Sequence, residues 1–325
     1  MILVTGATGH LGNVLVQEFI NRGQKVRALL LPGEDRTPLN GIDVELVEAD
    51  VLDYSALHRA FRGVQDVYHL AGLISILPGE DKALRLVNIL GTRNVIHAAR
   101  DHGVRRLLYT SSIHALSRVP HGITIDENIP YDPQGAISAY DQSKALASLE
   151  VLSAAKDGLN AVIACPTGII GPRDFRPSEM GQLILDCING KPQLYVEGAY
   201  DFVDVRDVAQ GLIQVSEHGK VGESYILSGE YLTVRRLLDT IQAVTGRRIP
   251  SLKIPLSLAK LSAPFAAYYY GQTKTKPRFT PYSLETLRSN SRISHEKASR
   301  KLGYSPRPLQ ESIADTIDWF TDNGN

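Results

Sequence analysis

The chain has 325 residues, of which 43% are apolar and 22% are charged, with 35 basic and 35 acidic side chains. This composition is typical of a globular protein with its own hydrophobic core, and it excludes a disordered chain and a disulfide-rich scaffold. The formal net charge of zero argues against nucleic-acid binding through a basic surface.

Other common classes are excluded by what the sequence lacks. The two cysteines, Cys165 and Cys187, are too few for a disulfide framework or a cysteine-rich metal site, so we expect no metal. No run reaches the roughly 18 apolar residues of a membrane span, and no signal segment precedes the first predicted strand. We therefore expect a cytoplasmic protein without a membrane span.

The first 165 residues alternate short apolar runs with amphipathic stretches of helical periodicity. The apolar runs predict buried parallel strands at residues 2–4, 26–31, 44–47, 67–70, 106–109 and 161–165. Repeated strand–helix–strand units predict an α/β fold with a doubly wound parallel sheet of the Rossmann type. Ligands bind such sheets beyond the carboxyl ends of the strands.

The alternation fades after Pro166, and residues 229–325 are helical with several proline breaks. Residues 203–228 contain a turn, a helix and a strand that suit the main sheet. We therefore expect a dinucleotide-binding domain from residues 1–165 plus about 203–228. A smaller, mostly helical substrate lobe is expected from residues 166–202 plus 229–325.

A glycine-rich loop joins the first predicted strand to the first helix, with Gly6, Gly9 and Gly12 at regular spacing. Glycines let the backbone turn tightly and approach a pyrophosphate, and the N-terminus of a helix attracts that anion. The loop therefore predicts a dinucleotide site. Asp50, at the end of the third strand, suits an adenine amino group, although a helix cap is the alternative for an acid there.

Tyr140 and Lys144 are four residues apart in a helical pattern, so they share one face of the helix. A nearby ammonium and an oxidised nicotinamide both favour the phenolate, which makes Tyr140 and Lys144 a sensible proton-transfer pair. Ser112 ends the fifth strand, where its hydroxyl suits a substrate oxygen. Asn88 interrupts a helix and suits an anchor near Lys144, with an ordinary surface asparagine as the alternative.

In order along the chain, these motifs resemble the extended short-chain dehydrogenase/reductase superfamily, the NAD-dependent epimerase/dehydratase family. They include TGATGHLG at 5–12, HLAG at 69–72, YTSS at 109–112, YDQSK at 140–144 and CPTGIIGP at 165–172. The resemblance implies that Tyr140 is the acid–base residue, that Lys144 lowers its pKa and holds the nicotinamide ribose, that Ser112 orients the reacting oxygen, and that Asn88 supports the proton relay. It also implies a set of cofactor-binding residues: Gly6, Thr8, Gly9, His10, Leu11, Gly12, Arg36, Asp50, Val51, Leu70, Ala71, Gly72, Tyr140, Lys144, Pro166, Thr167 and Ile169.

Within that superfamily the chain is most similar to the dihydroflavonol 4-reductase-like branch, through VRALL at 26–30 and LGYSPRPLQESIADTIDWF at 302–320. The best-known members carry an arginine for the NADP phosphate at the position of Leu31. NAD enzymes place an acid near Leu30. Because this chain has neither, we expect weak discrimination between the two cofactors, with a slight preference for NADP(H) through Arg36.

The expected function is NAD(P)-dependent hydride transfer on a carbonyl or alcohol of a small, apolar molecule. The alternatives are a nucleotide-sugar epimerase or dehydratase and a non-catalytic dinucleotide sensor. Tyr200 argues against nucleotide sugars, since those enzymes typically carry an arginine there for the diphosphate. Members of the superfamily commonly form homodimers. For Tyr268–Tyr270 and the basic stretch 274–307 we favour packing and a solvated face over substrate contacts.

Overall fold

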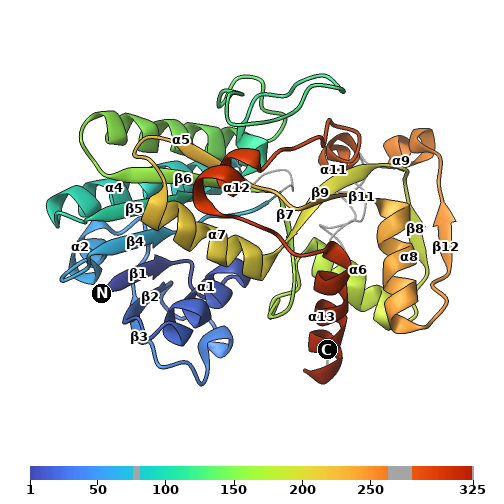
Figure 1. Cartoon of the computed structure of the whole chain (residues 1–325), viewed down its shortest axis with the longest axis horizontal. Coiled ribbons are helices and arrows are strands. Elements are labelled where there is room, and N and C mark those ends of the chain that lie inside the picture. The colour runs from blue at the N-terminus through green and yellow to red at the C-terminus, as the bar shows by residue number, and fades with distance from the viewer. Residues whose placement is uncertain (76–80, 263–279, 324–325) are drawn as a thin grey trace.

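The computed structural model describes residues 1–75, 81–262 and 280–323. Seven strands form one parallel sheet in the order β10-β6-β5-β4-β1-β2-β3 (Figure 1). The strand order reverses between β1 and β4, which is the switch point where open α/β sheets bind ligands. The doubly wound Rossmann fold expected from the sequence is confirmed.

The elements follow one another along the chain as the alternating pattern requires. The strands are β1 (Ile2–Thr5), β2 (Val26–Leu30), β3 (Glu45–Glu48), β4 (Asp66–His69), β5 (Arg106–Thr110), β6 (Ala161–Pro166), β7 (Gly168–Ile170), β8 (Gln193–Tyr195), β9 (Ala199–Asp204), β10 (Ser224–Leu227), β11 (Glu230–Thr233) and β12 (Ser251–Lys253). The helices are α1 (His10–Asn21), α2 (Tyr54–Ala60), α3 (Asp81–Arg85), α4 (Gly91–Asp101), α5 (Ala139–Lys156), α6 (Glu179–Ile188), α7 (Val205–His218), α8 (Val234–Thr245), α9 (Leu256–Ser262), α11 (Pro281–Thr286), α12 (Glu296–Leu302) and α13 (Leu309–Asp322). Short 3₁₀ turns lie at Thr37–Leu39 and Ile113–Ala115, and a π-helix lies at Leu86–Leu90.

Helices cover both faces of the main sheet, as the buried, nearly continuous apolar strands require. One face packs against α2, α4 and α5, and the other against α1, α7 and α12. Leu107 and Leu108 show how neighbouring positions of β5 point to opposite faces, because each belongs to a different core. Both cysteines are buried, and neither takes part in a disulfide within the described residues. The two cores fix the strand ends from which the site is built.

A second region lies beside the sheet and is built from segments before and after β10 (Figure 1). Its core joins α6, α8 and α13. It also contains two small sheets, β11-β9-β7 and β12-β8, which the sequence analysis did not anticipate. These strands are three to six residues long, too short to show a clear alternation. The proposed division into two domains stays a prediction, and Tyr268–Tyr270 lies outside the described residues.

Across residues 1–75, 81–262 and 280–323, every helix is too short or too polar to cross a membrane. The same ranges contain no group of three or more His, Cys, Asp or Glu side chains arranged to hold a metal ion.

Candidate active site

The glycine-rich loop leaves β1 and enters α1 in a tightly packed turn. Gly6 has a φ of +69°, and a Cβ there would lie 2.9 Å from the amide nitrogen of Ala71. The Leu70 and Ala71 amides donate to the Thr5 hydroxyl, which joins this loop to the end of β4. Gly9 precedes α1, and no side chain caps the first turn of the helix. The first backbone N–H groups of α1 therefore remain available to an anion.

Gly12 tests how closely this loop is packed. A Cβ on Gly12 would lie 2.0 Å from the carbonyl oxygen of Gly6. We expect Gly12→Ala to lower the free energy of unfolding by about 1–3 kcal/mol, the usual range for overpacking, and to weaken NADH binding. Chemical denaturation and fluorescence titration measure the two effects. Gly23→Ala is the control, because a Cβ there has open space but the φ of +68° strains an alanine, so this variant should lose stability and keep its NADH affinity. Unchanged NADH affinity in the Gly12 variant would contradict the expectation.

At the end of β5, two adjacent serines point in different directions. The Ser111 hydroxyl lies 2.7 Å from the Ser148 hydroxyl on α5. Ser112 begins the following 3₁₀ turn, where its hydroxyl accepts a hydrogen bond from the His114 amide. The Ser112 hydroxyl also lies close enough to the phenol of Tyr140 to lower its pKa. The structure thus brings Ser112, rather than Ser111, to the predicted acid–base residue.

Tyr140 and Lys144 lie on the first two turns of α5, which Ser138 caps by accepting a hydrogen bond from the Asp141 amide. Both side chains are buried. The Lys144 ammonium donates to the carbonyl oxygen of Thr110 at 2.8 Å. This contact fixes the ammonium beneath the strand end that carries Ser112.

Burial dominates the electrostatics of this pair. It raises the pKa of Tyr140 to about 12, a rise that the hydrogen bond from Ser112 opposes. Burial also lowers the pKa of Lys144 to about 8. Burial therefore disfavours the charged form of each group when the other group is neutral. When Tyr140 is a phenolate and Lys144 is an ammonium, their attraction offsets the cost of burying the two charges. The pair suits a proton that moves on and off Tyr140 as charge develops nearby.

Asn88 lies in the π-helix between α3 and α4, and its side chain is only 1% exposed. Its amide donates to the Leu73 carbonyl and the Ser143 hydroxyl at 3.0 and 2.9 Å, and accepts from the Leu73 amide at 2.8 Å. A Cβ on Gly72 would lie 3.0 Å from the Asn88 oxygen and 3.5 Å from the Lys144 nitrogen. Asn88 is therefore a buried anchor beside Lys144 and not a surface residue; its part in a proton relay stays a prediction.

The remaining predicted cofactor residues lie around the same strand ends, with some of their polar groups engaged in local hydrogen bonds. Asp50 follows β3 and accepts from the Leu52 amide, while Asp53 caps α2. Thr167 follows β6 and donates to Asp201 at 2.6 Å. The others are distributed over the same loops: His10 lies 3.0 Å from the Pro172 carbonyl, Val51 packs on Gly91, Pro166 ends β6, and Ile169 is in β7.

A buried polar cluster borders the predicted catalytic residues, and sequence reasoning missed most of it. The Tyr200 hydroxyl lies 2.7 Å from Nε2 of His114, and their rings stack. The Tyr282 hydroxyl donates to Asp141 at 2.7 Å. Burial lowers the pKa of His114, so its ring is neutral at neutral pH. The signal for His114 was its position two residues after Ser112; nothing in the sequence pointed to Tyr282.

A cavity of about 260 Å³ adjoins this cluster. Its walls have an apolar part and a polar part, and the polar part carries His114 and Tyr200 together with Arg118, Glu285 and Arg288. The apolar lining is formed by Ile113, Leu116, Val119, Pro120, Ile125 and Ile293. It begins one residue after Ser112, which makes it the natural place for the body of a substrate.

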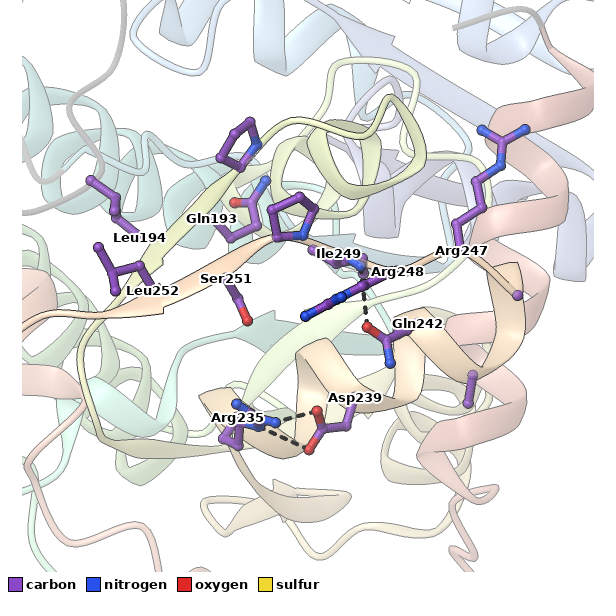
Figure 2. A pocket seen from close by; sticks show the side chains of 14 residues that line it. Gln193, Leu194, Arg235, Asp239, Gln242, Arg247, Arg248, Ile249, Ser251 and Leu252 are labelled. Carbon is purple, nitrogen blue, oxygen red and sulfur yellow. Dashed lines mark hydrogen bonds and ion pairs between the residues drawn. The ribbon is translucent and has the colours of Figure 1, made fainter.

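A larger cavity of about 1180 Å³ lies in the second region, between α8 and the β8–β12 pair (Figure 2). It is lined by none of the residues predicted for the site. Arg235 there is paired with Asp239, and Gln242 accepts from the Ile249 amide. Although this cavity is larger than the one beside His114 and Tyr200, none of the predicted site residues lines it, so it is not the candidate catalytic pocket.

Three of the six lysine and arginine side chains in the described part of the basic stretch 274–307 form ion pairs. Lys297 pairs with Glu223, Arg300 with Glu296, and Arg307 with Asp207. Lys274, Lys276 and Arg278 lie outside the described residues. The described part supports a structural and solvated role for this stretch.

Comparison with known proteins identifies the family. The sequence model of the NAD dependent epimerase/dehydratase family matches residues 2–228. This chain belongs to that family. “Sterol demethylase protein B” of Methylococcus capsulatus is 36% identical over 99% of this chain and 98% of its own length. “Putative dihydroflavonol 4-reductase” of Synechocystis is 31% identical over 99% of this chain and 94% of its own. The crystal structure of gox2253 matches with a TM-score of 0.87 and 34% identity, covering 100% of this chain and 98% of that one.

The family name implies a dinucleotide, and the residues present fit one. An NAD-dependent epimerase/dehydratase needs a loop that a phosphate can approach, and here Gly6 and Gly12 have no room for side chains. The N-terminus of α1 has no side-chain cap, and Lys144 is buried beside Gly72. The glycine loop and α1 would hold the pyrophosphate, and Lys144 the nicotinamide ribose. The bound nicotinamide would supply or accept the hydride.

Proposed function

We propose that this protein transfers hydride between a nicotinamide cofactor and a carbonyl or secondary alcohol on an apolar molecule. The observation that carries the proposal is the assembly of Ser112, Tyr140 and Lys144 at one strand end, next to a cavity with an apolar wall. In the reducing direction Tyr140 protonates the substrate oxygen, which Ser112 positions, and Lys144 stabilises the phenolate that results. In the oxidising direction the phenolate of Tyr140 takes the alcohol proton.

The apolar wall of the cavity supports an apolar substrate, and Arg118, on the polar wall, is paired with Glu285. Nucleotide-sugar enzymes of the superfamily typically place an arginine for the diphosphate at position 200. Here Tyr200 turns its hydroxyl to His114, and the stacked pair forms part of the cavity wall. Aromatic rings suit an aliphatic or aromatic body better than a charged one. The names of two relatives, a sterol demethylase protein and a dihydroflavonol reductase, point to polycyclic molecules of this kind.

The direct test is an assay of cofactor reduction with a steroid 3-alcohol and with UDP-glucose, followed by the absorbance of the reduced nicotinamide. We expect turnover with the steroid alcohol and none with the nucleotide sugar. Turnover of UDP-glucose to an isomer, with no net change in the nicotinamide, would establish the epimerase instead.

Binding measurements separate the same two functions without turnover. We expect UDP and UDP-glucose to bind the cofactor-loaded protein with dissociation constants weaker than about 10 μM, which corresponds to roughly −7 kcal/mol. The reason is the missing arginine at position 200, since a charge-assisted hydrogen bond contributes about 1.5–3 kcal/mol. Isothermal calorimetry measures the constants. Tighter binding would mean that another cationic side chain binds the diphosphate. Arg292, in the basic stretch 274–307, would be the first to examine.

A further inference from the structure

Glu34 lies in the turn after β2, and its carboxylate folds back onto the end of that strand. Its Oε2 accepts a hydrogen bond from the Leu31 amide at 3.0 Å. Its Oε1 accepts from the Thr8 hydroxyl at 2.5 Å, and Thr8 belongs to the glycine-rich loop. A carboxylate therefore spans the gap between the glycine loop and the end of β2, although neither Leu30 nor Leu31 supplies one.

Arg176, from the segment between β7 and α6, holds this carboxylate from the other side. Its guanidinium donates to Glu34 Oε1 at 3.1 Å and to the carbonyl and hydroxyl oxygens of Thr8 at 3.0 and 2.9 Å. The Glu34 side chain is only 18% exposed in this setting. Three donors from three segments thus fix its position before any cofactor binds.

The carboxylate still has capacity for one more donor. Its two oxygens have about four acceptor positions, of which Oε1 uses two and Oε2 uses one. The free position is on the oxygen next to the end of β2. In dinucleotide-binding folds, an acid about 20 residues after the glycine loop accepts a hydrogen bond from the adenosine ribose. Glu34 occupies the place of that acid, although it lies in the turn after β2 and not at the end of the strand itself.

Arg36 is directed to a different partner. It forms an ion pair with Glu48, the last residue of β3, at 2.5 Å. The guanidinium on which the sequence-based preference for NADP(H) rests is thus already paired with a carboxylate of its own. A 2′-phosphate, which carries about −1.5 to −2 charges, would instead face Glu34.

We propose that Glu34, held by Thr8 and Arg176, accepts a hydrogen bond from the ribose 2′-hydroxyl and makes this protein selective for NAD(H). This reverses the slight preference for NADP(H) predicted from Arg36. NADP(H) is disfavoured because its phosphate meets a fixed carboxylate, and because Arg176 can reach that phosphate only by leaving Glu34. The inference rests on the dinucleotide site of the proposed function.

The test is fluorescence titration of NADH and NADPH with the wild type and Glu34→Gln. The wild type should bind NADH at least about tenfold more tightly than NADPH, a difference of about 1.4 kcal/mol. The glutamine side chain of the variant keeps an oxygen for the Leu31 amide but has no charge, so Arg176 is released for the phosphate. We expect NADPH binding to tighten by about tenfold and NADH binding to weaken by a few fold.

Two further variants make the result specific. Arg176→Gln in the Glu34→Gln background should remove the gain in NADPH affinity, because the released guanidinium is its source. Arg36→Gln should leave the affinities for both cofactors unchanged. Melting temperatures of the variants without cofactor, compared with that of the wild type, show whether the fold is intact.

Either of two outcomes would overturn the inference. One is a wild type that prefers NADPH and loses that preference in Arg36→Gln, which would restore the role of Arg36. The other is a Glu34→Gln protein, folded as shown by its melting temperature, with the wild-type ratio of affinities. Neither result would affect the proposed function, since the titrations need no substrate and leave Tyr140 unchanged.

Discussion

Replacing Tyr140 with phenylalanine is expected to lower kcat by roughly 10²–10⁴-fold, the usual contribution of a positioned acid–base group. The phenol is the group whose pKa Ser112 lowers, and Lys144 lies beneath the same strand end. Phenylalanine keeps the ring and its packing, so NADH affinity should remain close to that of the wild type. Steady-state kinetics and cofactor titration on the same preparation measure the two quantities.

The adjacent serines of β5 give a matched control for this prediction. Ser112→Ala removes the hydroxyl that meets Tyr140, so turnover should fall with little change in stability. Ser111→Ala removes the hydroxyl that meets Ser148, which keeps its own hydrogen bond to the Lys144 carbonyl. Turnover should therefore stay near the wild-type value. Near-normal turnover in Tyr140→Phe, or equal losses in the two serine variants, would remove this pair from the mechanism.

The pH dependence follows from the same groups. Alcohol oxidation needs the phenolate of Tyr140, whose pKa of about 12 in the empty site leaves little phenolate at neutral pH. The rate of oxidation should therefore rise with pH, whereas carbonyl reduction needs the phenol and should not. In Tyr140→Phe this rise should be lost.

Much of the fold was predictable because local patterns and packing agree. The apolar runs that predicted β1 and β5 match strands at Ile2–Thr5 and Arg106–Thr110, since strands buried on both faces must be apolar throughout. The shared helix face of Tyr140 and Lys144 followed from their spacing of four residues, and the place of Ser112 at the crevice followed from the rule for parallel strand ends.

The unpredicted parts depend on contacts between distant segments. Glu34 and Arg176 meet only because the loop after β7 lies over the glycine-rich loop. His114, in the turn after β5, pairs with Tyr200, in β9. Neither pair has a spacing or periodicity that a sequence pattern can show. The same holds for the second region, whose short strands are defined by pairing between β7, β9 and β11 rather than by alternation.

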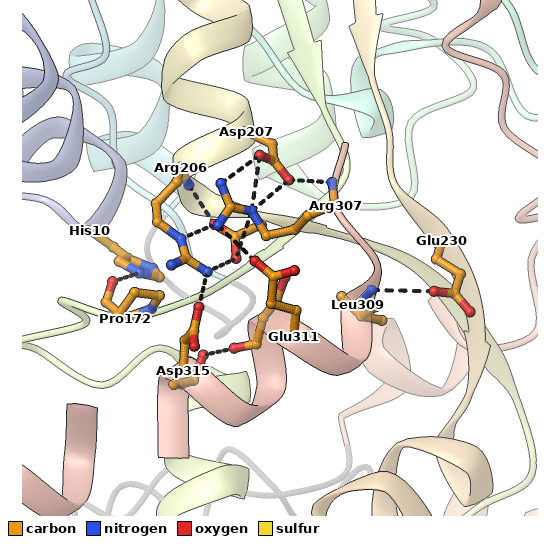
Figure 3. A network of polar contacts seen from close by, with 12 residues as sticks. His10, Pro172, Arg206, Asp207, Glu230, Arg307, Leu309, Glu311 and Asp315 are labelled. Carbon is orange, nitrogen blue, oxygen red and sulfur yellow. Dashed lines mark hydrogen bonds and ion pairs between the residues drawn. The ribbon is translucent and has the colours of Figure 1, made fainter. Parts of the chain in front are cut away.

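Replacing Arg307 with alanine is expected to lower the free energy of unfolding by about 3–5 kcal/mol, the range for breaking a buried ion pair. Arg307 lies between α12 and α13, and its guanidinium donates to the two oxygens of Asp207 on α7 at 3.0, 3.1 and 3.2 Å (Figure 3). The Asp207 side chain is only 6% exposed. Alanine would leave that carboxylate buried with only the backbone amide of residue 307 as a partner.

The neighbouring carboxylate, Asp204, should keep its main partner in Arg307→Ala. Asp204 lies 3.7 Å from Arg307, but Arg206 donates to both of its oxygens and also pairs with Asp315. Burial alone would raise the pKa of Asp204, yet the hydrogen bonds and the charge of Arg206 hold it below its ordinary value. Its contribution to stability is therefore present above the unfolded pKa near 4 and is lost as the pH falls through the lower folded pKa. This part of the network should survive in Arg307→Ala.

Denaturant unfolding near neutral pH measures the loss, and a double variant identifies its cause. Asp207→Asn combined with Arg307→Ala removes the stranded charge, so it should recover part of the stability that Arg307→Ala loses. Arg235→Ala, which breaks the exposed pair with Asp239 on α8, should be indistinguishable from the wild type. If the double variant is no more stable than Arg307→Ala, the loss comes from the packing of the arginine stem between α7 and α13 and not from the unpaired charge of Asp207.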